Sequence, residues 1–495
     1  MKNLALVNGI DLRAPAHRPL MDGRSAFSCS LEFARSLPDV TDRVVLLSAP
    51  VELPEGFRAV VRPSWTVADL MDQVAAAAEG HDHVFYHFAD CPFLDPELSR
   101  RMHQTHVRYW ADYTFADGYP AGISPEILTP ETVRRLRSMA DGGGTPRRDT
   151  LFTILKKDIN AFDVETEISS HDMRLLRLSL TADTERNYLL LSRIASAGVR
   201  TAEAACAFLR EQPEQQRTLP AFFPIQIVER CPQACSYCPY PRFGGDILRK
   251  NGAMPVETFS RLVRKIAAFS GDAVVDISLW GEPALHPRIE EIVRVALDVP
   301  GIDLVIETSG IGWPVGALSR IAEAGPRQPR WIVSLDASSE DLYRRLRGDG
   351  FAEAQRTAEE LLRRCPERTW VQAVRMKDNE EDLDSFYRAW KARTPNVIIQ
   401  KYDSHAGVLP DRAVADLSPL KRSPCWHLKR DMAILLDGTV PLCKEDLGTS
   451  VRLGNALQDD LAAVWASAQQ VFRSHVSGSY PGICAACDEY YTYNF

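Results

Sequence analysis

The sequence lacks several features that would place it in a class of protein at once. No run of apolar residues approaches the length of a membrane-spanning helix, and the first apolar stretch, after Lys2, is too short for a signal peptide. The formal net charge of −8 argues against a surface that coats nucleic acid. There is also no internal repeat or low-complexity segment. We therefore expect a cytoplasmic protein with no membrane or nucleic-acid partner.

The composition is ordinary for a globular protein, with 45% hydrophobic and 25% charged residues. The length of 495 residues predicts two to four domains. Eleven cysteines in a cytoplasmic protein favour metal or redox chemistry over disulfides. Seven of them fall in two groups, and the other four are scattered and expected in the core: Cys29, Cys91, Cys206 and Cys365.

The first group places three cysteines within eight residues, with the spacing C-x3-C-x2-C from Cys231 through Cys235 to Cys238, directly after the extended run 222–228. Three thiolates can hold three irons of a four-iron cluster and leave the fourth iron open to a small molecule. Zinc would prefer two C-x2-C pairs or a mixture with His, and no His is nearby. Three buried structural cysteines are the remaining alternative, although such thiols rarely crowd one loop.

Strand-like and helix-like segments alternate after these cysteines. With the strand before Cys231 they make six βα units, which predict a partial (β/α)6 barrel whose chemistry lies at the carboxyl ends of its strands. The expected strands are 273–279, 303–308, 331–335, 370–376 and 396–402, and the helices between them include 255–269, 287–297 and 353–364.

Residues suited to ligand binding lie at or after the ends of several of these strands: Gly281, Glu282, Ser309, Ser334 and Asp336. A glycine lets the backbone approach a ligand, and a glutamate accepts hydrogen bonds from an ammonium group. Serine and aspartate can bind ribose hydroxyls, and an arginine can bind a carboxylate. A ligand with an amino-acid end, a ribose and an affinity for iron is S-adenosylmethionine.

Residues 221–410 resemble the radical SAM enzymes. The three cysteines match the family's CxxxCxxC loop, and Tyr237 matches its usual aromatic residue before the third cysteine. Trp280-Gly281-Glu282 resembles the family's GGE-type strand end, with Trp in place of the first Gly. The resemblance implies that Tyr237 and the five strand-end residues contact S-adenosylmethionine. Arg347 is a candidate partner of its carboxylate, and the alternative for Arg347 is a solvated helix face.

The second group consists of Cys425, Cys443, Cys484 and Cys487. The Asp437-Gly438 pair between apolar runs predicts a hairpin that carries Cys443 back toward Cys425. Four thiolates suit either a fully coordinated iron–sulfur cluster or zinc.

The segment 411–495, a small Cys-rich α+β extension, resembles the SPASM/Twitch module of radical SAM enzymes. That module implies one auxiliary [4Fe-4S] cluster, and the whole arrangement resembles the spiro-SPASM family. Related enzymes that use a carboxylate base often place an Asp directly after the hairpin cysteine. Lys444 stands there, and Asp446 is near but not equivalent, so no base is assigned.

The first 195 residues predict an open α/β domain, with strands at 4–7, 43–48 and 83–88 and helices at 25–37 and 66–78. Asp90 and Asp183 are candidates for a Mg²⁺ site or for helix N-caps, and Asp95 for an N-cap. The domain resembles nucleotidyltransferases, in which an Asp matching Asp90 holds Mg²⁺. It departs from them because the stretch after the first strand has one Gly where several are expected. A helical run, 186–212, leads into a helical linker at 196–220.

These observations predict an enzyme that reductively cleaves S-adenosylmethionine at a [4Fe-4S] cluster. The resulting 5′-deoxyadenosyl radical would take a hydrogen atom from a peptide or a nucleotide- or sugar-linked substrate. The expected electron donor is a protein such as flavodoxin or ferredoxin. Two alternatives stay open: a bifunctional protein with Mg²⁺-dependent nucleotidyltransferase activity in its first domain, and a non-catalytic iron–sulfur scaffold or electron carrier.

Overall fold

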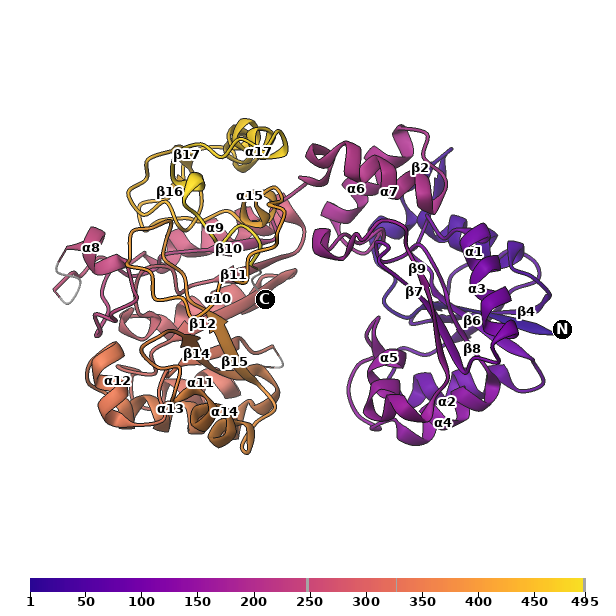
Figure 1. Ribbon diagram of the computed structural model, residues 1–495, viewed down its shortest axis with the longest axis horizontal. Helices are drawn as coiled ribbons and strands as arrows, with labels where there is room; N and C mark the ends of the chain where they lie inside the picture. The colour runs from indigo at the N-terminus through magenta and orange to yellow at the C-terminus, as the bar shows by residue number, and fades with distance from the viewer. Residues whose placement is uncertain (246–248, 326, 493–495) are drawn as a thin grey trace. The chain divides into compact units, whose positions relative to one another are not determined.

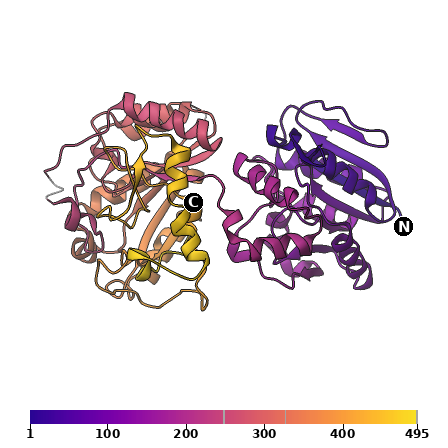
Figure 2. The same cartoon turned by 90° about the horizontal axis from the view of Figure 1, so that it is seen from above.

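The computed structural model describes residues 1–245, 249–325 and 327–492. The chain divides into two compact units, Met1–Thr218 and Leu219–Phe495 (Figure 1 and Figure 2). The division lies inside the segment 196–220, which the sequence predicts as a helical linker. Among the described residues, every helix is too short or too polar to cross a lipid bilayer.

The first unit contains a seven-stranded sheet in the order β5-β4-β1-β6-β8-β7-β9. Strands β5, β4, β1 and β6 run parallel, whereas β8 is antiparallel to both of its neighbours. The sheet strands are β1 (Asn3–Gly9), β4 (Val40–Leu47), β5 (Arg58–Val61), β6 (His83–Phe88), β7 (Tyr113–Asp117), β8 (Glu126–Leu128) and β9 (Val164–Ile168), and a small ribbon joins β2 (Pro19–Met21) to β3 (Arg24–Ser25).

Helices cover both faces of this sheet (Figure 1). Successive side chains of a strand point to opposite faces, so Leu4 and Leu6 of β1 pack in one core and Ala5 and Val7 in the other. This explains why residues 4–7 of β1 are an uninterrupted apolar run. One layer holds α2 (Val67–Ala78), α4 (Pro130–Met139) and α5 (Thr150–Leu155), and the other holds α1 (Ala26–Ser36), α3 (Pro96–Arg108), α6 (Glu185–Ser196) and α7 (Ala202–Glu211).

The predicted continuous helix at 186–212 is wrong. The chain leaves α6 at Ser196 and starts α7 at Ala202, because Gly198 adopts a φ of 75°, in the left-handed region that glycine tolerates. Both helices pack in the core of the first unit. The predicted N-cap at Asp95 is confirmed, since its side chain accepts hydrogen bonds from the backbone of Glu97 and Leu98.

The second unit contains an open, curled sheet of six parallel strands in sequential order, β10 to β15. The strands are β10 (Phe222–Pro224), β11 (Ala273–Asp276), β12 (Ile302–Thr308), β13 (Arg330–Ser334), β14 (Thr369–Arg375) and β15 (Val397–Lys401). The helices between them are α8 (Tyr240–Gly244), α9 (Val256–Ser270), α10 (Ile289–Asp298), α11 (Ala317–Glu323), α12 (Glu340–Arg347), α13 (Phe351–Arg364) and α14 (Leu383–Lys391). Each strand segment that the sequence predicts here overlaps one of these strands.

The C-terminal segment, yellow in Figure 2, belongs to the same unit. It contains α15 (Trp426–Arg430), β16 (Thr439–Pro441), β17 (Arg452–Asn455), α16 (Leu461–Ser467) and α17 (Gln469–Val476). The chain reverses at Asp437-Gly438 as expected, where Gly438 donates to the Leu435 carbonyl over 2.9 Å. The expected hairpin partner is wrong, however, because β16 pairs with β17. The run before the turn instead forms parallel bridges with the edge strand β10 and the residue after it, Asp431 with Phe222 and Ile434 with Ile225.

Phe223 of β10 tests the packing of this edge, because its side chain is fully buried in the core of the second unit. Phe223→Ala should lower the free energy of unfolding by about 3–5 kcal/mol, since it removes a large apolar side chain and leaves a cavity. Val315→Ala, at a side chain that is 97% exposed, should change the stability little. Urea unfolding followed by tryptophan fluorescence measures both. Equal stability of the two variants would contradict the packing described.

Candidate active site

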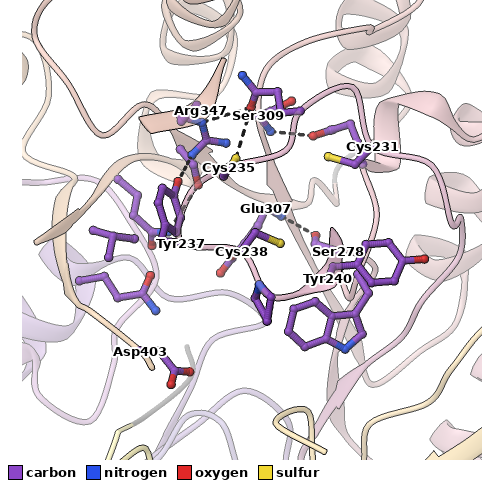
Figure 3. Close-up of a pocket in the computed structure, with 18 of the residues that line it drawn as sticks. Cys231, Cys235, Tyr237, Cys238, Tyr240, Ser278, Glu307, Ser309, Arg347 and Asp403 are labelled. Atoms are coloured by element: carbon purple, nitrogen blue, oxygen red, sulfur yellow. Dashed lines mark hydrogen bonds between the residues drawn. The ribbon is translucent and has the colours of Figure 1, made fainter. Parts of the chain in front are cut away.

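A cavity of about 1100 Å³ lies at the carboxyl ends of the strands of the second unit (Figure 3). The loop after β10 contributes Cys231, Cys235 and Cys238, which line the cavity as free thiols. Its wall also contains residues from the ends of β12, β13 and β15 and from the C-terminal segment. The volume includes space that is open to solvent, and groups from the barrel and from the C-terminal segment meet in it.

The thiol loop is held by a buried ion pair. Arg347 of α12 binds Asp336, at the end of β13, with an N–O distance of 2.5 Å, and the two side chains are 7% and 0% exposed. The Tyr237 hydroxyl lies 2.5 Å from both partners, and Gln233 accepts a hydrogen bond from Arg347 over 3.2 Å. The loop therefore cannot shift without breaking charge-assisted hydrogen bonds in a buried place.

Two sequence-based interpretations change here. Arg347 is not part of a solvated helix face, because its side chain is buried. Asp336, predicted to contact a ribose, is turned away from the cavity, since its two carboxylate oxygens bind the Val374 backbone, Tyr237 and Arg347. Both residues position the thiol loop in this structure.

The segment Trp280-Gly281-Glu282 follows β11 and lines the cavity. A Cβ on Gly281 would lie 2.1 Å from the Val228 carbonyl oxygen, so only glycine fits against the neighbouring backbone. Trp280 has a φ of 50°, which is unusual for a large side chain. The buried Glu282 carboxylate accepts hydrogen bonds from Thr308 over 2.6 Å and from the Ser309 backbone over 2.7 Å.

Two serines on neighbouring strand ends also reach the cavity. Ser309 follows β12, and its hydroxyl accepts a hydrogen bond from the Ile311 backbone over 3.3 Å. Ser334 ends β13, and Gln372 donates to its hydroxyl over 3.5 Å. The structure thus brings together at one cavity the three thiols and all the predicted cofactor residues except Asp336, whose side chain lies behind Tyr237 and Arg347.

The opposite wall of the cavity is charged, and the sequence analysis missed it. Lys401 ends β15, Asp403 and His405 follow it, and Lys444 comes from the C-terminal segment. His405 lies 2.6 Å from Glu445, and Lys444 lies 3.3 Å from the same residue. The signal was available, because Asp403 and His405 stand directly after a predicted strand, where ligands of parallel sheets are expected.

The four C-terminal thiols gather around a small apolar core that includes Cys425 and Cys484. Burial raises the pKa of the Cys425 thiol to about 12. Burial also raises the pKa of the Cys443 and Cys487 thiols. Neighbouring groups add to the rise, and Cys425 is one of them in both cases. Asp446 lies away from the cavity and binds the backbone of Ser450 and Val451.

In the first unit, a second cavity of about 600 Å³ lies at the carboxyl ends of β1 and β6 and includes Asp90. The Arg148 guanidinium forms an ion pair with Asp90 and lies 3.5 Å from Asp183. Burial raises the pKa of Asp90, and the charge of Arg148 opposes this. The predicted Mg²⁺ site is not supported by this structure, in which the Arg148 guanidinium contacts both carboxylates.

Comparison with known proteins identifies two domains in the second unit. Residues 225–389 match the radical SAM superfamily, and residues 425–488 match the SPASM iron–sulfur cluster-binding domain. An uncharacterized protein of Treponema pallidum is 40% identical over 358 residues, which are 70% of this chain and 98% of that protein.

Two further likenesses are more distant. The PqqA peptide cyclase of Ruegeria pomeroyi is 30% identical over 177 residues, which are 35% of this chain and 45% of the cyclase. The crystal structure of Streptococcus suis SuiB bound to S-adenosylmethionine has a TM-score of 0.42 and 16% identity, and the likeness covers 64% of this chain and 77% of SuiB.

The chain carries a radical SAM domain and a SPASM domain, so it is an enzyme of the class that uses [4Fe-4S] clusters and S-adenosylmethionine. Its residues fit these groups. The three thiols on one loop are unpaired and face a common cavity. Burial raises the pKa of Cys231 and Cys238 to about 12, so both thiols need a bound cation to ionise near neutral pH.

The role of Arg347 as an anchor can be separated from any ligand contact by stability measurements. Arg347→Ala should lower the free energy of unfolding by about 3–5 kcal/mol, because Asp336 would remain buried without a counter-charge. Arg344→Ala is the matched control on the same helix: that side chain is 53% exposed, and its loss should cost at most about 1 kcal/mol. Urea unfolding measures both, and an undiminished stability of Arg347→Ala would contradict the anchoring role.

The ion pairs of Arg148 make a second prediction. Wild-type protein should show no rise in melting temperature on addition of MgCl2, because the guanidinium holds both candidate ligands. Arg148→Ala frees Asp90 and Asp183 and should gain stability from the same salt. Differential scanning calorimetry checks both proteins. A magnesium-dependent rise in the wild type that disappears in Asp90→Asn would show that the carboxylates bind the ion in spite of Arg148.

Proposed function

We propose that this enzyme cleaves S-adenosylmethionine at a cluster held by Cys231, Cys235 and Cys238 and takes a hydrogen atom from a peptide substrate. The observation that supports it most is the common cavity, where three free thiols face Glu282 and a charged wall. When bound, the cluster supplies the electron that splits S-adenosylmethionine, and the nucleoside fragment takes the hydrogen atom. Cys425, Cys443, Cys484 and Cys487 would hold the auxiliary cluster.

The side chains around the thiols have distinct tasks in this proposal. Glu282 accepts hydrogen bonds from the ammonium group of S-adenosylmethionine, and Gly281 lets the strand end pack closely against the Val228 backbone. Ser309 and Ser334 offer hydroxyls to polar groups of the nucleoside. Tyr237, Asp336 and Arg347 act from behind the loop and keep the thiols at fixed positions, which a reaction requires of its bound groups.

Aromatic rings cover one side of the cavity. Tyr240 and Trp280 stack with their centroids 6.1 Å apart, and the Trp280 ring meets His405 edge-on at 5.7 Å. Gln226 fixes both residues, since its amide donates to the Tyr240 hydroxyl and to the Trp280 carbonyl. These rings exclude water from the place where a reactive fragment would be released, which protects it from side reactions.

A peptide substrate is favoured by the relationship to a protein that acts on a peptide, as its name states. A nucleotide- or sugar-linked substrate has less support, because Arg148 contacts both carboxylates that were predicted to bind Mg²⁺ in the first unit. An electron donor such as a flavodoxin or ferredoxin stays a prediction.

The test is anaerobic reconstitution with iron and sulfide, followed by iron counting and by an assay of 5′-deoxyadenosine release with dithionite. The wild type should bind about eight irons and release 5′-deoxyadenosine. Replacing Cys231, Cys235 and Cys238 together by Ala should leave about four irons and abolish the release. Cys365→Ala, a buried cysteine outside the cavity, should keep both. Full iron content in the triple variant would contradict the assignment of these ligands.

A further inference from the structure

The charged wall of the cavity points to a specific kind of substrate. We propose that Glu307 is a specificity-determining residue that binds a cationic group of the substrate, an ammonium or guanidinium such as a lysine or arginine side chain carries. This inference rests on the proposed function, because it concerns the substrate of the same cavity.

The cations of the cavity are already neutralised by the protein. Arg347 is paired with Asp336, Lys401 with Asp488 and Glu489, and Lys444 with Glu445. None of these side chains is therefore left over to bind an anionic substrate. A ligand that enters the cavity meets cations whose charge is balanced by carboxylates within ion-pair distance.

Glu307 differs from these groups. It lies near the end of β12, its backbone N–H donates to the Ser278 hydroxyl over 2.7 Å, and its side chain is exposed to the cavity (Figure 3). Its carboxylate forms no hydrogen bond or ion pair with any of the residues that the structure describes. The other glutamate of the lining, Glu282, has its carboxylate bound to Thr308 and Ser309. Glu307 therefore presents to a ligand a carboxylate that no described residue binds.

A second carboxylate supports Glu307 from the neighbouring strand. Asp276 ends β11, and the parallel pairing of Asp276 with Val305 places it beside the strand that carries Glu307. The pKa of Asp276 is raised to about 7 by burial and then by the charge of Glu307. Two carboxylates on neighbouring strand ends repel each other. The Lys444 charge relieves part of this repulsion, and a cationic group of the substrate would relieve more of it.

The surroundings suit a cation on an aliphatic stem. The stacked rings of Tyr240 and Trp280 line the same cavity, and aromatic faces attract ammonium and guanidinium groups. Ser278 connects these features, since it lies two residues before Trp280 and fixes the backbone of Glu307. An apolar wall beside an unpaired carboxylate favours lysine or arginine side chains over small hydrated cations.

S-adenosylmethionine also carries positive charge, so its position must be separated from that of the substrate. Glu282 lies beside the thiol loop, where its backbone N–H donates to the Arg230 carbonyl next to Cys231. Burial raises the pKa of Glu307, and the charges of Lys444 and then of Arg347 oppose this rise. The Glu282 carboxylate has hydrogen-bond partners beside the thiol loop, whereas the Glu307 carboxylate has none among the described residues, so we assign Glu282 to the cofactor and Glu307 to the substrate.

The test uses the reconstituted full chain loaded with S-adenosylmethionine and isothermal titration calorimetry. The probes are the N-methylamides of Nα-acetyl-lysine, Nα-acetyl-arginine and Nα-acetyl-norleucine, of which the last has a similar stem and no charge. At least one cationic probe should bind about tenfold more tightly than the norleucine probe. Glu307→Gln should remove this preference, and Glu307→Asp should retain part of it. Glu367→Gln, at an exposed glutamate of the same unit, is the matched control and should keep the full preference.

Three results would overturn the inference: equal binding of charged and neutral probes, no binding of either cationic probe, or a preference that survives in Glu307→Gln. A loss of S-adenosylmethionine affinity in Glu307→Gln would also overturn it, by assigning the carboxylate to the cofactor. Release of 5′-deoxyadenosine by the same preparation separates the two proposals. If release occurs without a preference for cations, only this inference fails, whereas absence of release counts against the proposed function itself.

Discussion

The buried ion pair between Arg347 and Asp336 is the interaction on which the cavity depends. It joins the helix α12 to the end of β13, and through Tyr237 and Gln233 it holds the loop that carries the three thiols. A flexible loop with three thiolates would bind metal poorly, because the ligands would lose conformational entropy on binding. The protein fixes them in advance with charges that are costly to separate, and the low polarity around them strengthens the hold.

The architecture of the second unit could be read from the sequence, because its information is local. Apolar runs and turn residues locate strands such as 303–308, and the order of strands and helices determines a parallel sheet. The spacing of Cys231, Cys235 and Cys238 indicates their shared location for the same reason. Such patterns need only neighbours along the chain.

Contacts between distant segments were harder to predict. Nothing near Asp336 in the sequence indicates that its carboxylate faces Arg347 and Tyr237 rather than the cavity. In the same way, Arg148 stands 58 residues from Asp90, so the ion pair that replaces the expected metal could not be anticipated. The chain reverses at Asp437-Gly438, as the local sequence predicts. Tertiary structure decides that the segment before the turn pairs beside β10 and that β16, after the turn, pairs with β17.

The C-terminal segment and the barrel share one set of charges. Charged residues directly follow two cysteines of the C-terminal segment. Asp488 and Glu489, after Cys487, form ion pairs with Lys401 at the end of β15. Glu445, two residues after Cys443, pairs with His405 from the loop after β15 and with Lys444. A chimera that received its last eighty residues from a relative would therefore contain only one partner of each ion pair that involves Lys401 or His405. To restore neutrality it would also need the donor's residues from the rim of the barrel, so the two parts must diversify together rather than as interchangeable modules.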